Sequence, residues 1–298
     1  MSNNSIFGLS AALVTPFAKS GEVDLARLVR HADWVIDNGC DSLTLFGTTG
    51  EGFSIGLRER GAMLEAVLGN GLDAAEKLYA AVSSSVIEDA AAQAKLALDL
   101  GARGLLFTPP FYLKGLDDEG LYAWFCRCFE AIGPSLRGVI LYHIPGQTAV
   151  PLSVDLVARL RTAFPQAIAG IKDSSGDWAT AEGFLAAHGD LAILVGDERL
   201  LARAMAAGAQ GSICGLANFA PQLLRPVIHA GQPEPRVKAI VEMVLENPVL
   251  PAVKALVAHV HDDDAYACTR PPLVDLPPER ARDLGARLDG ALSQTVAA

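Results

Sequence analysis

Lys172 is the residue of this sequence whose surroundings most clearly suggest chemistry. It stands in the stretch A-I-A-G-I-K-D-S-S-G (residues 167–176), directly after Ile171 and with no polar residue for several positions before it. A short apolar run that breaks into small polar residues is typical of a buried parallel strand ending in a loop. A lysine at such a position loses hydration, which favours its neutral, nucleophilic form and so a Schiff base with a carbonyl substrate. An ion pair with Asp173 or another carboxylate is the alternative interpretation.

The segment Gly47-Thr48-Thr49-Gly50-Glu51 follows another short apolar run. It offers two hydroxyls, and the glycines leave backbone N–H groups exposed, so the turn can bind a carboxylate without a formal cation. An ordinary Ser/Thr turn would have the same composition.

Two tyrosines follow apolar runs in the same way. Tyr142 comes after Val139, Ile140 and Leu141, and Tyr112 ends the motif P-P-F-Y. A phenol near a neutral lysine could transfer protons during imine formation. Either tyrosine could instead be a core residue with a satisfied hydroxyl.

The remaining candidates are weaker. Asp197 and Glu198 could be paired carboxylates, but their position favours a helix start. His143 could be a base, yet the six histidines show no ligand-like spacing, and we expect no metal site. We expect no external cofactor. A doubly wound open sheet is the alternative to a closed barrel, but no G-x-G-x-x-G follows the first strand.

These candidates all stand at the ends of predicted strands. Apolar runs alternate with helical periodicity along about 220 residues, eight times in all, which predicts a parallel (β/α)₈ barrel with its active site at the C-terminal ends of the strands. Asp24 is the expected N-cap of the first helix. The expected strands lie at 10–16, 42–47, 77–83, 104–108, 138–142, 167–172, 191–196 and 211–214, and the expected helices at 25–38, 57–68, 87–100, 118–132, 154–164, 179–188 and 199–207.

From about Pro221 onward the sequence predicts helices without strands, punctuated by prolines. We therefore expect a barrel over residues 1–220 and a helical extension over 221–298 that packs on the barrel as part of one structural unit. No linker-like composition separates the two.

The composition of the chain excludes several classes of protein and of binding partner. A hydrophobic content of 51% and a charged content of 19% over 298 residues predict a well-cored globular protein. A net charge of −10 and the absence of a basic run argue against nucleic acid as a partner. No signal peptide and no apolar run of about eighteen residues is evident, so we expect a cytoplasmic protein with no membrane partner. The five scattered cysteines are expected to be reduced thiols.

Taken together, the motifs resemble those of the dihydrodipicolinate synthase/N-acetylneuraminate lyase family of Schiff-base-forming class I aldolases. The resemblance runs essentially from end to end. It rests on A-A-L-V-T-P-F, G-T-T-G-E, P-P-F-Y, L-Y-H-I-P, G-I-K-D-S-S-G and G-S-I-C-G-L-A-N, which occur in this order.

The resemblance implies specific roles. Lys172 would form an imine with C2 of pyruvate or a related 2-oxo acid, and Tyr142 would be its general acid/base. Thr49 and the adjoining backbone N–H, at Gly50, would bind the carboxylate. Thr48 would link Tyr142 to Tyr112 of a neighbouring subunit in a homotetramer built as a dimer of dimers. Gly196 and Ile213 would line the lysine pocket.

Two positions near the expected substrate, and two at the expected lysine-feedback pocket, depart from the family pattern. Gln147 stands where true dihydrodipicolinate synthases present an arginine to the second substrate's carboxylate, and an amide cannot supply that charged, bidentate contact. His143 stands where asparagine is common and could contact a different substrate. Leu57 and Arg60 stand where regulated synthases often have histidines, which argues against feedback by lysine.

We therefore expect a Schiff-base lyase or synthase that forms or cleaves a carbon–carbon or carbon–oxygen bond. Its expected substrates are a 2-oxo acid, with pyruvate as the first candidate, and an aldehyde. Dihydrodipicolinate synthase is the first activity that the resemblance suggests. The alternatives are an aldolase or dehydratase acting on a 2-keto-3-deoxy sugar acid, a non-catalytic 2-oxo acid binding protein and a metal-dependent barrel aldolase.

Overall fold

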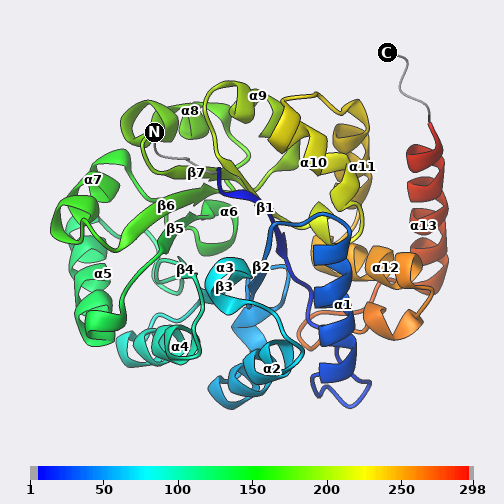
Figure 1. The fold of residues 1–298 in the computed structure, drawn as a ribbon, viewed down its shortest axis with the longest axis horizontal. Coiled ribbons are helices and arrows are strands. Elements are labelled where there is room, and N and C mark those ends of the chain that lie inside the picture. Colours follow the sequence, from blue (N-terminus) through cyan, green and yellow to red (C-terminus); the bar gives the residue numbers. More distant parts are fainter. Residues whose placement is uncertain (1–5, 295–298) are drawn as a thin grey trace.

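Eight parallel strands close into a barrel in the order of the sequence, and helices surround them (Figure 1). This computed structural model describes residues 6–294. The fold confirms the predicted (β/α)₈ barrel. The strands are β1 (Gly8–Ala12), β2 (Ser42–Leu45), β3 (Leu78–Val82), β4 (Gly104–Phe107), β5 (Val139–His143), β6 (Ile168–Asp173), β7 (Ala192–Val195) and β8 (Gly211–Cys214).

The strands are short and buried almost throughout. Every residue of β1, β2, β3, β4, β5 and β8 is buried, since one face lines the barrel interior and the other packs under helices. This explains why the strands appear in the sequence as continuous apolar runs rather than as alternating patterns. A polar side chain in such a strand is therefore conspicuous, as Lys172 is in β6.

Helices cover the outside of the barrel, and their limits agree closely with the helical periodicity of the sequence. Asp24 caps the first helix as predicted, since its side chain accepts a hydrogen bond from the Arg27 N–H at 3.0 Å. The helices up to β8 are α1 (Leu25–Asp37), α2 (Leu57–Gly69), α3 (Ala74–Lys77), α4 (Ile87–Asp99), α5 (Asp118–Ile132), α6 (Pro145–Thr148), α7 (Val154–Ala163), α8 (Trp178–His188) and α9 (Leu201–Ala206).

Two predicted elements differ from the structure. The first strand ends at Ala12 instead of Pro16, because the next residues turn over the barrel end, where the Thr15 hydroxyl donates to the Gly50 carbonyl at 2.7 Å. The predicted helix 199–207 is divided into a 3₁₀ turn (Glu198–Leu200) and α9.

The chain after β8 is helical, with α10 (Pro221–Ala230), α11 (Pro235–Leu245), α12 (Val249–His261) and α13 (Pro278–Ser293). Helix α10 packs on β1 and α9 and so takes the place of the eighth barrel helix. In Figure 1 α11, α12 and α13 lie beside the barrel, next to α10 and α1. The division of the chain at residue 220 stays a prediction, and the eighth barrel helix lies after it.

Candidate active site

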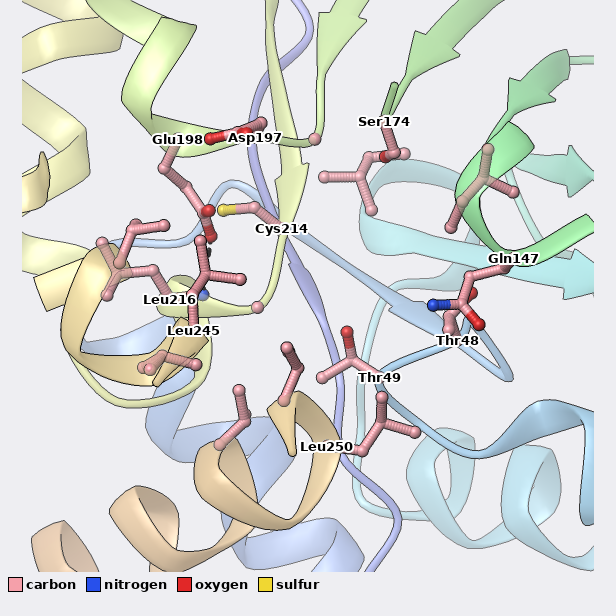
Figure 2. A pocket seen from close by; sticks show the side chains of 18 of the residues that line it. Thr48, Thr49, Gln147, Ser174, Asp197, Glu198, Cys214, Leu216, Leu245 and Leu250 are labelled. Carbon is pink, nitrogen blue, oxygen red and sulfur yellow. Dashed lines mark hydrogen bonds between the residues drawn. The ribbon is translucent and has the colours of Figure 1, made fainter. Parts of the chain in front are cut away.

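A cavity of about 250 Å³ opens at the C-terminal ends of the barrel strands, between them and helices α11 and α12. Figure 2 shows it from close by. Seven of the predicted site residues line it: Thr48, Thr49, Tyr142, Gln147, Lys172, Gly196 and Ile213.

Lys172 and Tyr142 form the centre of the site. They are register partners on the adjacent strands β6 and β5, so both side chains enter the barrel interior at the same height. The Lys172 Nζ donates to the Tyr142 hydroxyl at 3.1 Å and lies 4.2 Å from the centre of its ring. Lys172 is only 4% exposed. This places a buried amine and a phenol in direct contact at the end of the barrel.

The environment of Tyr142 favours proton transfer. Burial raises the pKa of the phenol, but the Lys172 ammonium and hydrogen bonds from nearby hydroxyls outweigh burial and hold that pKa below its ordinary value. The Thr48 hydroxyl lies 3.5 Å from the Tyr142 oxygen, which is longer than a normal O–H···O hydrogen bond. A phenol with a lowered pKa can more readily accept and return a proton.

The G-T-T-G-E segment forms a tight loop after β2. Thr48 and Thr49 line the cavity, whereas Gly50 does not. A Cβ at Gly50 would lie 2.4 Å from the Leu13 carbonyl oxygen, so this position requires glycine for close backbone packing. The structure thus places Gly50 behind the cavity wall, where it supports the two threonines.

Gly196 is needed for the space around the lysine. A Cβ there would lie 1.9 Å from the Ser174 Oγ and 3.1 Å from the Lys172 Cε. Ile213, on β8, is fully buried and lines the same pocket. Both lie where the family resemblance implied.

Gln147 lies at the wide end of the cavity. It comes from the short helix α6 and lines both this cavity and an adjoining pocket that contains Phe53 and Phe111. Figure 2 shows its amide on the same side as Thr48. The amide therefore lies between the cavity that Lys172 lines and the adjoining pocket.

His143 lies outside the cavity, which corrects the expectation that it contacts substrate. Side chains of successive strand residues point to opposite faces, so His143 points away from the interior that Tyr142 enters. Its Nδ1 accepts the Leu152 N–H at 2.9 Å, and its ring packs against Phe184 of α8. Burial lowers the pKa of His143 to about 4.

Tyr112 does not contact Thr48 or Tyr142 within the chain. It is 83% exposed and follows β4 in a loop with Phe111 and Leu113, which are also exposed. Its proposed role at the site therefore requires a second subunit and stays a prediction.

Leu57 and Arg60 lie apart from the cavity. Arg60 is buried, and its guanidinium donates to the carbonyls of Ile55, Ala81 and Gly52. Arg60 therefore holds the loop after β2 to β3, while Leu57 is half-exposed at the start of α2.

Asp197 and Glu198 begin a 3₁₀ turn, as their position indicated, and both also line the cavity. Asp197 pairs with Arg199. Glu198 accepts the Leu216 N–H at 2.9 Å, and burial raises the pKa of its carboxyl. Figure 2 shows Glu198 and Cys214 together on the side of the cavity opposite Gln147.

Sequence reasoning missed the residues that complete the cavity. Ser174 could have been found, because it stands two positions after the lysine in a strand-end loop. The apolar part has no such signal. The missed residues are Ile144, Ser174, Cys214, Gly215, Leu216, Phe219, Val241, Val244, Leu245, Val249, Leu250 and Val253.

Two properties of the described residues bear on other functions. Among residues 6–294, no three His, Cys, Asp or Glu side chains are grouped so that they could hold a metal ion. No helix in that range is both long and apolar enough to cross a membrane.

Known proteins match this chain along almost its whole length. The model of the dihydrodipicolinate synthetase family matches residues 5–290. A DapA-like lyase of uncharacterised function from Chloroflexus aurantiacus is 32% identical over 296 residues, which cover 97% of this chain and 98% of the relative.

Solved structures of similar proteins also match this chain over almost its whole length. Dihydrodipicolinate synthase from Agrobacterium tumefaciens str. C58 is 47% identical and superimposes with a TM-score of 0.93 over 96% of this chain and 99% of that one. YagE from E. coli K12, solved in complex with pyruvate, is 21% identical with a TM-score of 0.86 over 96% and 98% of the two chains and shows the fold alone. The chain belongs to the dihydrodipicolinate synthetase family.

Proposed function

We propose that this protein is a class I lyase or synthase in which Lys172 forms a Schiff base with pyruvate or a related 2-oxo acid. The observation that carries the proposal is the contact between the buried Lys172 amine and the Tyr142 phenol, 3.1 Å apart at the floor of a cavity. A desolvated amine beside a proton donor is what imine formation requires.

The reaction follows from this pair. After its ammonium has lost a proton, Lys172 adds as the free amine to C2 of the 2-oxo acid, and the carbinolamine loses water to give the imine. Loss of a proton from C3 gives an enamine, whose C3 bonds to the carbonyl carbon of an aldehyde while the aldehyde oxygen takes up a proton. Water then hydrolyses the imine and releases a 4-hydroxy-2-oxo acid with the free lysine. Cleavage is the reverse sequence.

The other site residues support these steps. Tyr142 transfers the protons, since its lowered pKa brings it closer to the range in which it can act as a base. Thr48 and Thr49 line the same cavity as Lys172, and their hydroxyls are suited to bind the substrate carboxylate. Tyr112 completes a proton relay from a neighbouring subunit of a homotetramer, and the enzyme acts in the cytoplasm.

Borohydride trapping with pyruvate tests the proposal. We expect a mass increase equal to reduced pyruvate, which peptide mapping locates on Lys172. The variant Lys172→Arg keeps the charge but cannot form the imine, and we expect no adduct with it. Thermal unfolding of the variant checks that the fold is retained.

The outcomes separate the alternatives. Labelling of Lys172 by 2-keto-3-deoxy sugar acids but not by pyruvate would favour the sugar-acid enzyme. An adduct that persists in a folded Lys172→Arg protein, or no adduct with any 2-oxo acid, would refute the Schiff-base mechanism.

A further inference from the structure

One wall of the cavity is apolar, and the family motifs contribute nothing to it. Helices α11 and α12 each contribute three side chains to it. We call these six residues the apolar wall: Val241, Val244, Leu245, Val249, Leu250 and Val253. Figure 2 shows Leu245 beside Leu216 and Leu250 below Thr49, both away from Ser174. The wall is continuous with the pocket that contains Lys172.

The exposure of the apolar wall increases from the floor to the mouth. Val253 and Val244 are 3% and 7% exposed, whereas Val249 and Leu245 are 41% and 48% exposed. Apolar side chains that border a cavity gain free energy when an apolar group displaces water from them. The shape therefore favours a ligand whose apolar end extends from Lys172 toward Leu245.

The charges around the cavity disfavour an anionic second substrate. Among the described residues that line the cavity, Lys172 is the only lysine or arginine, and the imine consumes its amine. Asp197 and Glu198 are the lining carboxyl groups, and the nearby Arg199 is already paired with Asp197. A carboxylate or phosphate on the aldehyde would thus be desolvated with no cation to compensate it.

Hydroxyl groups would also be poorly matched along the apolar wall. Gln147 supplies one amide at the opposite side, but the six residues of the wall carry no polar side-chain atom. A buried hydroxyl that loses its water without a new hydrogen bond is bound less well than a methyl group of similar size.

We propose that the second substrate of this enzyme is an uncharged aldehyde with an apolar substituent, which packs against the apolar wall while its carbonyl carbon meets the enamine on Lys172. This inference rests on the proposed function and specifies its substrate class. The product is then a 4-hydroxy-2-oxo acid with an apolar tail.

Two matched pairs of aldehydes test the inference in the condensation with pyruvate. In 4-methylpentanal an isopropyl group replaces the carboxylate of succinic semialdehyde, and in 2-methylbutanal two methyl groups replace the hydroxyls of glyceraldehyde. We expect kcat/KM to be at least about tenfold higher for the apolar member of each pair. Shortening the apolar chain by one methylene should lower kcat/KM about fourfold.

Variants of the apolar wall should change this preference. Leu250→Arg places a cation beside the substituent, and we expect kcat/KM for succinic semialdehyde to rise at least about tenfold relative to 4-methylpentanal. Leu245→Lys, at a half-exposed position that tolerates charge, provides a second test if Leu250→Arg does not fold. Val274→Arg is the control, because Val274 is 80% exposed and does not line the cavity.

Trapping with pyruvate in each protein keeps the two proposals apart. If the wild type traps pyruvate but prefers succinic semialdehyde to 4-methylpentanal, or glyceraldehyde to 2-methylbutanal, this inference is overturned and the proposed function stands. Wall variants with the same preference as Val274→Arg would also overturn it. No trapping in the wild type would overturn the proposed function and this inference with it.

Discussion

At the scale of single residues, the position of Lys172 depends on the absence of a side chain at Gly196. The space is so limited that a methyl group there would overlap the Ser174 hydroxyl and touch the lysine stem. We expect Gly196→Ala to displace the Lys172 amine and to lower the rate of pyruvate trapping about 100-fold, since a misplacement of about 1 Å has an effect of this size. Single-turnover trapping measures this rate.

Gly61→Ala is the matched control for that substitution. Gly61 lies within α2, and a Cβ there would be 4.0 Å from the nearest atom, Leu96 Cδ1, which is an ordinary contact. We expect an unchanged trapping rate and an increase in stability of about 0.5–1 kcal/mol. A Gly196→Ala protein that traps pyruvate as fast as Gly61→Ala would contradict our account of the pocket.

The residues at the site were predictable to different degrees. Lys172 and Tyr142 could be found because polar side chains are conspicuous in strands that are buried on both faces. The error at His143 was avoidable, since a strand that points Tyr142 inward must point its neighbour outward. The role of Gly50 in close packing could not be predicted, because it depends on Leu13, which is distant in the sequence.

At the scale of elements, a buried ion pair joins the loop after β2 to helix α12. Lys254 Nζ and Glu51 Oε1 are 2.6 Å apart, both side chains are fully buried, and the Arg270 N–H donates to the other carboxylate oxygen at 3.0 Å. Burial lowers the pKa of Lys254, while Glu51 opposes that change. The pair therefore links the threonine loop to the helix that supplies half of the apolar wall.

Glu51→Gln should destabilise the protein strongly, because it leaves the Lys254 ammonium buried without its counter-charge. We expect the free energy of unfolding to fall by about 3–5 kcal/mol, as measured by denaturant titration. Glu246→Gln removes a partner from the exposed pair with Arg287, and we expect it to leave the free energy of unfolding nearly unchanged, because water and salt screen exposed charges. If the two variants lose the same free energy of unfolding, the buried pair contributes no more to stability than the exposed one.

The double variant Glu51→Gln/Lys254→Met adds a second check. Replacing the ammonium by an apolar side chain removes the uncompensated charge, so much of the lost stability should return. A double variant as unstable as Glu51→Gln would mean that the damage lies in the loop and not in the buried charge.

The elements themselves were largely predictable, and their partners were not. Continuous apolar runs and helical periodicity placed the strands and helices to within a few residues. The pairing of Glu51 with Lys254 spans 203 positions, and no pattern in either segment indicates it. For the same reason the contribution of 241–253 to the cavity was missed, since a helix face that borders a cavity has the same composition as one that packs on a core.

At the scale of the whole molecule, two buried histidines make stability depend on pH. Burial lowers the pKa of His31 to about 3 and that of His143 to about 4 from an ordinary value of 6.5. Below pH 6.5 the unfolded chain therefore binds protons that the folded chain does not. The contribution of these two histidines to the free energy of unfolding is therefore fully present above about pH 6.5. It is lost as the pH falls toward 4 for His143 and toward 3 for His31.

His143→Asn should remove part of this dependence, because an amide does not titrate and can still accept the Leu152 N–H. We expect the loss of unfolding free energy between pH 7.5 and pH 5 to be smaller by about 2 kcal/mol than in the wild type. Asp173, 4.0 Å from His143, remains in both proteins, so the difference reports the histidine. Parallel stability–pH curves for the two proteins would contradict the buried neutral state of His143.

The placement of the apolar wall has a consequence for how such an enzyme can be altered. Lys172 is built into a barrel strand, whereas the apolar wall, which we propose contacts the second substrate, belongs to helices more than sixty positions later in the chain. Substitutions in 241–253 can therefore be combined in a library without disturbing the strand that holds the lysine. Selecting such a library for new aldehydes, with pyruvate trapping as the test of intact chemistry, would make one scaffold a source of many carbon–carbon bond-forming catalysts.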